Sequence, residues 1–233
     1  MIDSLALTPF EVEALTLSLW VSGWAVLASL PPGIACAWLL ARCRFPGKSL
    51  VDGLIHLPLV LPPVVVGYAL LVTFGRRGVV GAWLYDTFGF TFAFNWKGAA
   101  LASAVIAFPL LVRAVRLSLD SIDKGLEDAA RTLGAGPVRV FFTITLPLVT
   151  PGIITGVILA FARSLSEFGA TITFVSNIPG ETRTLPIALY TLTQVPGGDA
   201  GAIRLCIISV VVAFIALIAS EILARRVSRR IEG

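Results

Sequence analysis

The chain has 233 residues, of which 57% are hydrophobic and only 14% charged, and its mean hydropathy is +0.91. An average soluble domain is much more polar, so this composition excludes an ordinary soluble enzyme or binding protein and indicates an integral membrane protein. The net charge of +4 comes from basic residues dispersed between apolar segments, a distribution that does not indicate a nucleic-acid-binding surface.

Five segments are apolar and long enough to cross a bilayer, which takes about 20 residues. They cover residues 12–41, 54–74, 98–118, 148–174 and 202–224. We expect one all-α, multi-pass transmembrane domain over residues 1–233, because the segments leave no room for a separate soluble domain. The first and fourth segments exceed the minimum length, so we expect them to tilt or to extend past the bilayer.

Basic residues divide unequally between the two sides of this five-helix arrangement. Twelve lie on the side of the central loop and the C-terminus: Arg42, Arg44, Lys48, Arg113, Arg116, Lys124, Arg131, Arg139, Arg225, Arg226, Arg229 and Arg230. Five lie on the other side: Arg76, Arg77, Lys97, Arg183 and Arg204. Because Lys and Arg accumulate in cytoplasmic loops, we expect the central loop and the C-terminus in the cytoplasm and the N-terminus outside.

The loop between the third and fourth segments, residues 119–147, combines charged with small residues and predicts a short exposed helix. Asp123 stands where negative charge stabilises a helix N-terminus, and Gly134 is a typical residue for ending a helix. Ala129 and Ala130 are small enough to let the surface of a partner approach the backbone closely. The loop is therefore a candidate docking element.

This loop resembles the coupling loop of the membrane subunits of bacterial ABC importers. That family has the pattern Glu-Ala-Ala, three residues, Gly, nine residues, Ile-x-Leu-Pro. The matching residues here, with two neighbouring charges, are Glu127, Asp128, Ala129, Ala130, Arg131, Gly134, Ile144, Leu146 and Pro147. Asp128 stands where the family has Glu, with Glu127 beside it, so the sequence leaves open which carboxylate meets a partner. The resemblance implies a coupling helix that docks on an ATP-hydrolysing subunit; the alternative is an ordinary solvated loop.

A closer resemblance extends over nearly the whole chain, from about residue 12 to residue 224. The strings HLPLVLPPVVVGYALLV, RVFFTITLPL and FARSLSEFGATITFVSNIPGETRT resemble the permeases of molybdate importers. This implies the helical-bundle fold of ABC importer permeases, a place in the bacterial inner membrane, and transport by alternating access. It also implies a second copy of the chain, two cytoplasmic ATPase subunits and a periplasmic oxyanion-binding protein as partners, besides membrane lipid. Sulfate and tungstate permeases share the architecture and remain alternatives.

Two places in the apolar segments are candidates for the translocation path or its gate. Pro62 and Pro63 interrupt the second segment, and broken helices at that depth are tolerated where they face protein or a water-filled path. In the fourth segment, Arg163 and Glu167 lie four residues apart, with Ser166 beside them. Opposite charges persist in a membrane when they are paired or face a pathway. Kinked packing and a structural ion pair are the respective alternatives to a gate.

The sequence does not indicate a nucleotide-binding, metal-binding or catalytic site within the chain. Gly47-Lys48-Ser49 resembles the end of a phosphate-binding loop, but Arg42 stands where that motif needs Gly, and no buried strand precedes it. His56 has no second His, Cys or carboxylate that we place at ligand spacing, so we expect no metal site. We therefore expect no catalytic residues and no cofactor in this chain, with ATP and Mg²⁺ bound by the partner ATPase.

Two other classes of membrane protein compete with the importer. A passive anion channel or a secondary transporter would need neither the spaced loop nor an ATPase, and the two halves of the chain show no inverted repeat that would support one. A membrane-embedded enzyme would need clustered His, Asp or Cys residues, and one His with scattered carboxylates is too little.

Overall fold

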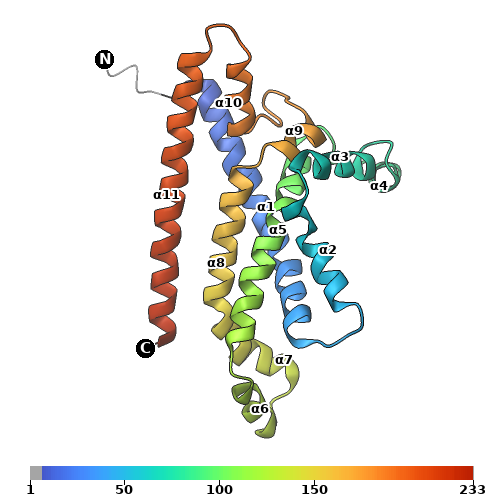
Figure 1. The fold of residues 1–233 in the computed structure, drawn as a ribbon, viewed down its shortest axis with the longest axis vertical. Helices are drawn as coiled ribbons and strands as arrows, with labels where there is room; N and C mark the ends of the chain where they lie inside the picture. The colour runs from blue at the N-terminus through green and yellow to red at the C-terminus, as the bar shows by residue number, and fades with distance from the viewer. Residues whose placement is uncertain (1–6, 233) are drawn as a thin grey trace.

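The computed structural model describes the backbone of residues 7–232, and its regular elements over that range are all helices (Figure 1). They are α1 (Pro9–Arg42), α2 (Lys48–Val60), α3 (Pro63–Phe74), α4 (Val79–Phe88), α5 (Trp96–Ser121), α6 (Lys124–Thr132), α7 (Pro137–Val140), the π-helical turn η1 (Phe141–Thr145), α8 (Leu146–Leu165), α9 (Gly169–Val175), α10 (Leu185–Thr193) and α11 (Asp199–Glu232). The side chains of the four arginines near the C-terminus, which contribute to the predicted orientation, lie outside the described residues.

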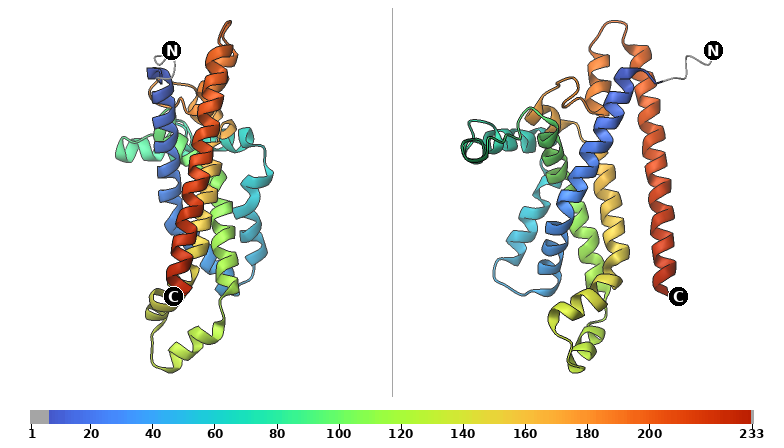
Figure 2. Two further views of the ribbon diagram at one scale, coloured as in Figure 1. Left: turned by 90° about the vertical axis from the view of Figure 1, so that its left-hand side faces the viewer. Right: turned by 180° about the vertical axis from the view of Figure 1, so that it is seen from behind.

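Four helical stretches are long and apolar enough to cross a membrane: Pro9–Arg42, Trp96–Ser121, Pro137–Leu165 and Asp199–Ala219. A fifth crossing is possible if α2 and α3, which meet at 113°, together count as one span. The long helices α1, α5, α8 and α11 run along the long axis, and α3 and α4 extend to one side (Figures 1 and 2). The start of α1 lies at one end of the molecule, while α6, α7 and the end of α11 lie at the other (Figure 1).

Two of the predicted apolar segments are not continuous helices. Within the segment 54–74, the chain turns at Leu61, whose ψ of 142° is extended. The physical reason is Pro62–Pro63, because proline lacks an N–H group and disfavours helical geometry in the residue before it. The segment 148–174 is also broken, since α8 ends at Leu165 and a separate short helix, α9, begins at Gly169.

Helix α5 forms the centre of the bundle, with α1 and α8 packed against it. Its buried positions carry small and branched apolar residues, including Ala102, Ile106 and Leu111. Helix α8 approaches closely because it presents glycine: a Cβ atom at Gly156 would lie 2.9 Å from Leu111 Cδ1. Small residues at such positions let membrane helices pack backbone to backbone, which fixes α8 and everything attached to its two ends.

Candidate functional site

The predicted coupling loop forms a protrusion at one end of the molecule, beyond the ends of α5 and α8 (Figure 1). Asp123 caps α6, because its Oδ1 atom accepts a hydrogen bond of 2.8 Å from the backbone N–H of Gly125. The helix ends at Thr132, and Gly134, two residues further on, has a φ of +87°, in the left-handed region that glycine adopts without strain. The N–H of Ala135 then donates to the carbonyl of Ala130 at 3.1 Å and closes the turn.

The protruding loop carries apolar side chains that are exposed. Leu133 is 88% exposed, and Leu126 and Val138 are also exposed. Ala129 and Gly134 are exposed between them, and Ala130 is half-buried. Exposed apolar residues grouped in this way and bordered by charge indicate a surface that meets another protein.

Glu127 points away from that surface, into the molecule, and is only 6% exposed. Its Oε1 atom accepts hydrogen bonds of 2.9 Å from Arg42 Nη2, at the end of α1, and of 2.9 Å from Thr145 Oγ1, in η1. Arg131 Nη2 lies 3.8 Å from its Oε2 atom. Glu127 therefore ties the exposed helix α6 to two elements that continue into the membrane-spanning bundle.

Asp128 has the opposite orientation, with a side chain that is 69% exposed. Among the described side chains it pairs only with Arg131 of the same helix, whose Nη1 atom lies 2.9 Å from Asp128 Oδ1. An exposed pair of this kind contributes little to stability, so both groups are available to a partner. Of the two neighbouring carboxylates, Asp128 is thus the one that a docking protein can reach.

The last part of the motif lies where the loop enters the bundle. Ile144 falls in η1 and is half-buried, and Leu146 and Pro147 begin α8. The N–H of Leu146 bonds to the carbonyl of Phe141, five residues back, which is the widened turn of a π-helix. Pro147 favours such a turn because its ring would clash with the carbonyl four residues back in a regular α-helix.

The two candidate gate regions, far apart in the sequence, lie against each other. A Cβ atom at Gly169 would lie 2.9 Å from Pro63 Cβ, and one at Gly67 would lie 2.8 Å from Ala170 Cα. The break after α2 therefore packs on the break after α8, as the adjacent α3 and α9 in Figure 1 show. Interrupted helices at membrane depth are tolerated where they are buried in protein or line a water-filled cavity.

The charged pair at this junction has unequal partners. Glu167 is buried, with a side chain that is 1% exposed; its Oε1 atom accepts a hydrogen bond of 2.8 Å from Ala170 N–H, and its Oε2 atom lies 3.0 Å from Arg163 Nη2. It thereby caps α9 and neutralises Arg163. The Arg163 side chain is 29% exposed, and Ser166 is exposed and donates to the Arg163 carbonyl at 3.1 Å. Only Arg163 and Ser166 of this group could meet a passing ion.

Sequence reasoning missed the residues that hold these sites in place. Nothing in the sequence connects Arg42 with Glu127, although it is the main partner of Glu127, 85 residues further on. Thr145 occupies the unspecified position of the Ile-x-Leu-Pro motif. Gly67, which admits α9, lies in an apolar run and gives no signal by itself. Pairings over such distances depend on the fold, and no local pattern indicates them.

Known proteins that resemble the chain cover almost all of it. Residues 31–229 match the family described as binding-protein-dependent transport system inner membrane component. The molybdenum transport system permease protein ModB of Escherichia coli (strain K12) is 68% identical over 227 residues, which are 97% of this chain and 99% of that protein. The protein of the same name from Haemophilus influenzae is 58% identical, over 95% of this chain and 96% of that one.

A solved structure with the same fold is that of a bacterial alginate ABC transporter in complex with an alginate pentasaccharide-bound periplasmic protein. It superposes with a TM-score of 0.77 at 20% sequence identity, over 97% of this chain and 82% of that one. At this identity the likeness concerns the fold alone.

Proposed function

The chain belongs to the binding-protein-dependent transport system inner membrane component family, and from this we propose that it is the permease subunit of an ATP-driven importer of molybdate. It is a multi-pass protein of the bacterial inner membrane. The observation that carries the substrate is the 68% identity to the Escherichia coli molybdenum permease over 97% of this chain. The geometry of the protruding loop and of the two broken helices supports the mechanism.

Transport proceeds by alternating access. ATP binding closes a pair of cytoplasmic ATPase subunits, which pull on the coupling helices of two permease copies and open the path outward. Hydrolysis returns the permease to its inward-facing state. The ATPase can drive this change only because it binds one state of the permease more tightly than the other.

Helix α6 is the coupling helix in this mechanism. Asp128, with the exposed apolar residues Leu126, Leu133 and Val138, forms the surface that docks on the ATPase. Glu127 does not reach the partner but transmits the motion of α6 to Arg42 at the end of α1 and to Thr145 at the foot of α8. The permease binds no ATP or Mg²⁺ and breaks no bond. The partner ATPase binds ATP and Mg²⁺ and hydrolyses the ATP.

The path runs between two copies of the chain, because one bundle of this size is too small to surround a channel. Pro62 and Pro63, with Arg163 and Ser166, line it at the junction of the broken helices. A periplasmic binding protein delivers the oxyanion from the end opposite the coupling helix. The path is polar and binds the anion weakly, since a dianion is costly to place in hydrocarbon and must also be released.

The test is uptake of labelled molybdate into liposomes that hold the permease with its ATPase and receive the loaded binding protein. We expect uptake that requires ATP on the side of the membrane where the ATPase lies and that stops with vanadate. Unlabelled molybdate should inhibit uptake of the label far more effectively than sulfate does. Uptake by the permease alone, insensitive to vanadate, would instead identify a passive channel or a secondary transporter. Equal displacement by sulfate would remove the assignment of molybdate while leaving the importer class intact.

A further inference from the structure

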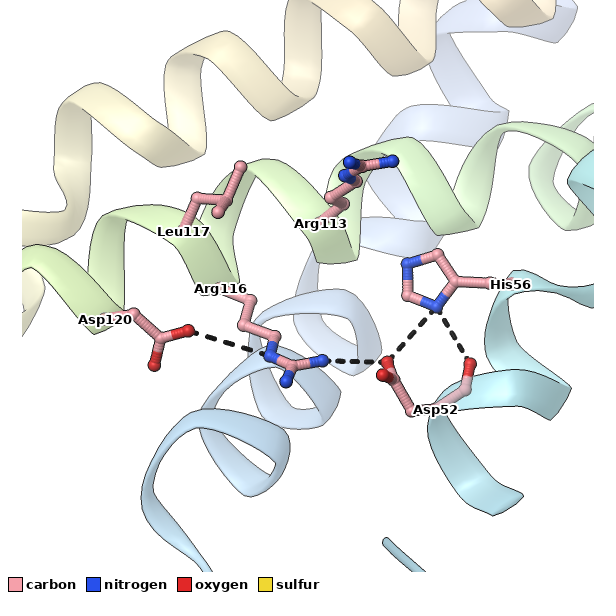
Figure 3. Close-up of a pocket in the computed structure, with 6 residues that line it drawn as sticks. All are labelled: Asp52, His56, Arg113, Arg116, Leu117 and Asp120. Atoms are coloured by element: carbon pink, nitrogen blue, oxygen red, sulfur yellow. Dashed lines mark hydrogen bonds and ion pairs between the residues drawn. The ribbon is translucent and has the colours of Figure 1, made fainter. Parts of the chain in front are cut away.

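A polar pocket of about 320 Å³ lies between α2 and α5, apart from the coupling loop and the junction of broken helices (Figure 3). Its lining residues are Asp52, His56, Arg113, Arg116, Leu117 and Asp120. No local pattern in the sequence indicates this group, because the two pairs of residues, Asp52 with His56 and Arg113 with Arg116, are about 60 residues apart.

The two carboxylates of the pocket share one guanidinium, which neutralises them only in part. Arg116 Nη1 donates to Asp52 Oδ1 at 2.8 Å, and Arg116 Nε lies 3.7 Å from Asp120 Oδ2 (Figure 3). One guanidinium thus stands between two acids and offsets their repulsion of an incoming anion. The pairing also leaves Arg116 with little capacity for a further ligand.

Two donors remain. Arg113 lines the pocket, is exposed, and forms no hydrogen bond or ion pair with any described side chain. His56 Nδ1 lies 2.8 Å from the carbonyl oxygen of Asp52, so it carries the proton of that hydrogen bond. The other ring nitrogen, Nε2, points away from Asp52 on the side of the ring that faces α5 (Figure 3).

Both groups lie well inside their helices. Arg113 precedes the last residue of α5 by eight positions, and His56 follows the first residue of α2 by eight, which places both about 12 Å from the helix ends at 1.5 Å per residue. Ionisable residues inside membrane-spanning segments face the protein interior or a water-filled cavity. A pocket of this volume holds about ten waters, enough room for a tetrahedral oxyanion with part of its hydration shell.

We propose that Arg113 and His56 form an anion subsite in the cytoplasmic half of the translocation path, where the tetrahedral oxyanion stops before release. This inference rests on the proposed function. Arg113 supplies the fixed positive charge, and Asp52, itself held by Arg116, orients the His56 ring. The nearby carboxylates keep the affinity low, as a transit site requires.

The phosphate of a lipid headgroup has the same tetrahedral oxyanion chemistry, and the experiment separates the two sources. Complete transporter is reconstituted with wild-type permease, Arg113→Gln or Arg113→Lys, in liposomes of phosphatidylcholine alone and of phosphatidylcholine with phosphatidylglycerol. Uptake of labelled molybdate and stimulation of the ATPase by loaded binding protein are both measured. Arg44→Ala is the matched control, since Arg44 is exposed on the same side of the membrane and lines no part of the pocket.

In both lipid mixtures we expect Arg113→Gln to lower uptake about tenfold, as the loss of one charge-assisted hydrogen bond in the path would do. Stimulated ATP hydrolysis should persist, because the docking surface is intact, and Arg113→Lys should keep uptake within about twofold of wild type because it keeps the charge. Arg44→Ala should behave as wild type.

Three results would overturn the subsite. Equal uptake by Arg113→Gln and Arg44→Ala would show that Arg113 does not contact the anion. An equal loss in Arg113→Lys would show that size, not charge, matters there. A loss seen only with phosphatidylglycerol would assign the pocket to lipid headgroups. Wild-type transporter that takes up no molybdate at all would overturn the proposed function, and the subsite with it.

Discussion

Glu127 and Asp128 are adjacent in the sequence but act in different places, because successive residues of a helix point about 100° apart. The motif predicted that a carboxylate here matters and could not say which one. The answer depends on Arg42 and Thr145, which lie outside α6 and donate hydrogen bonds to Glu127. A local pattern thus predicted the chemistry of the site, while long-range packing determined the role of each residue.

Substitution of these two carboxylates should have opposite consequences. Glu127→Ala leaves the guanidinium of Arg42 buried without its partner, so we expect a loss of about 3 kcal/mol in the stability of the permease. Asp128→Ala should change the stability by less than about 1 kcal/mol, because its ion pair is exposed, but should weaken binding of the ATPase. Thermal unfolding of the purified permease and co-purification with the ATPase measure the two effects.

The charge-reversed double variant Arg42→Glu with Glu127→Arg is the control for this pair. It should recover part of the stability that either single reversal loses, since the ion pair is restored. Normal stability of Glu127→Ala together with loss of the ATPase would show instead that Glu127 meets the partner directly.

At the scale of elements, apolar length predicted where helices lie and could not predict whether they are continuous. The break at Pro62–Pro63 was visible in the sequence. The break between Leu165 and Gly169 was not, because Ser166, Glu167 and Phe168 are tolerated inside helices. It exists because Glu167 caps α9 and because α3 packs against α9 with no space for further side-chain atoms at Gly67.

The ion pair that joins α8 to α9 gives a prediction at this scale. Arg163→Ala leaves Glu167 buried and uncompensated, so we expect a loss of roughly 2–3 kcal/mol, moderated by the partial exposure of Arg163. Uptake and the yield of assembled transporter should fall with it. Arg139→Ala, in an exposed side chain of α7, is the comparison and should leave the stability of the permease unchanged. Equal effects of both substitutions on thermal unfolding would remove the special role of the α8–α9 pair.

For the whole molecule, composition and the distribution of basic residues predicted the membrane class and the orientation. The structure separates the start of α1 from the protruding α6 and α7, which lie at opposite ends (Figure 2). What composition could not predict is which helices become neighbours: the packing of α5 between α1 and α8 depends on single small residues such as Gly156.

The orientation predicts which residues a membrane-impermeant thiol reagent can reach. In a variant whose three native cysteines are replaced, Thr8→Cys should react in intact cells after outer-membrane permeabilisation. Asp128→Cys should react only once the inner membrane is broken, because the distribution of basic residues predicts a cytoplasmic location for that end. Labelling of Asp128→Cys from outside would reverse the assigned orientation and the side on which the ATPase binds.

The π-helical turn Phe141–Thr145, at the foot of α8, holds one residue more than the same turn of an α-helix would. If this turn tightened to α-helical geometry, the helix after the turn would move by one residue relative to the helix before it. This is a rotation of about 100° and a shift of about 1.5 Å. Glu127 in α6 is connected to this turn by the hydrogen bond that it accepts from Thr145. A small movement of the coupling helix α6 would then rotate α8. The rotation would change the far end of α8, where the two broken helices meet.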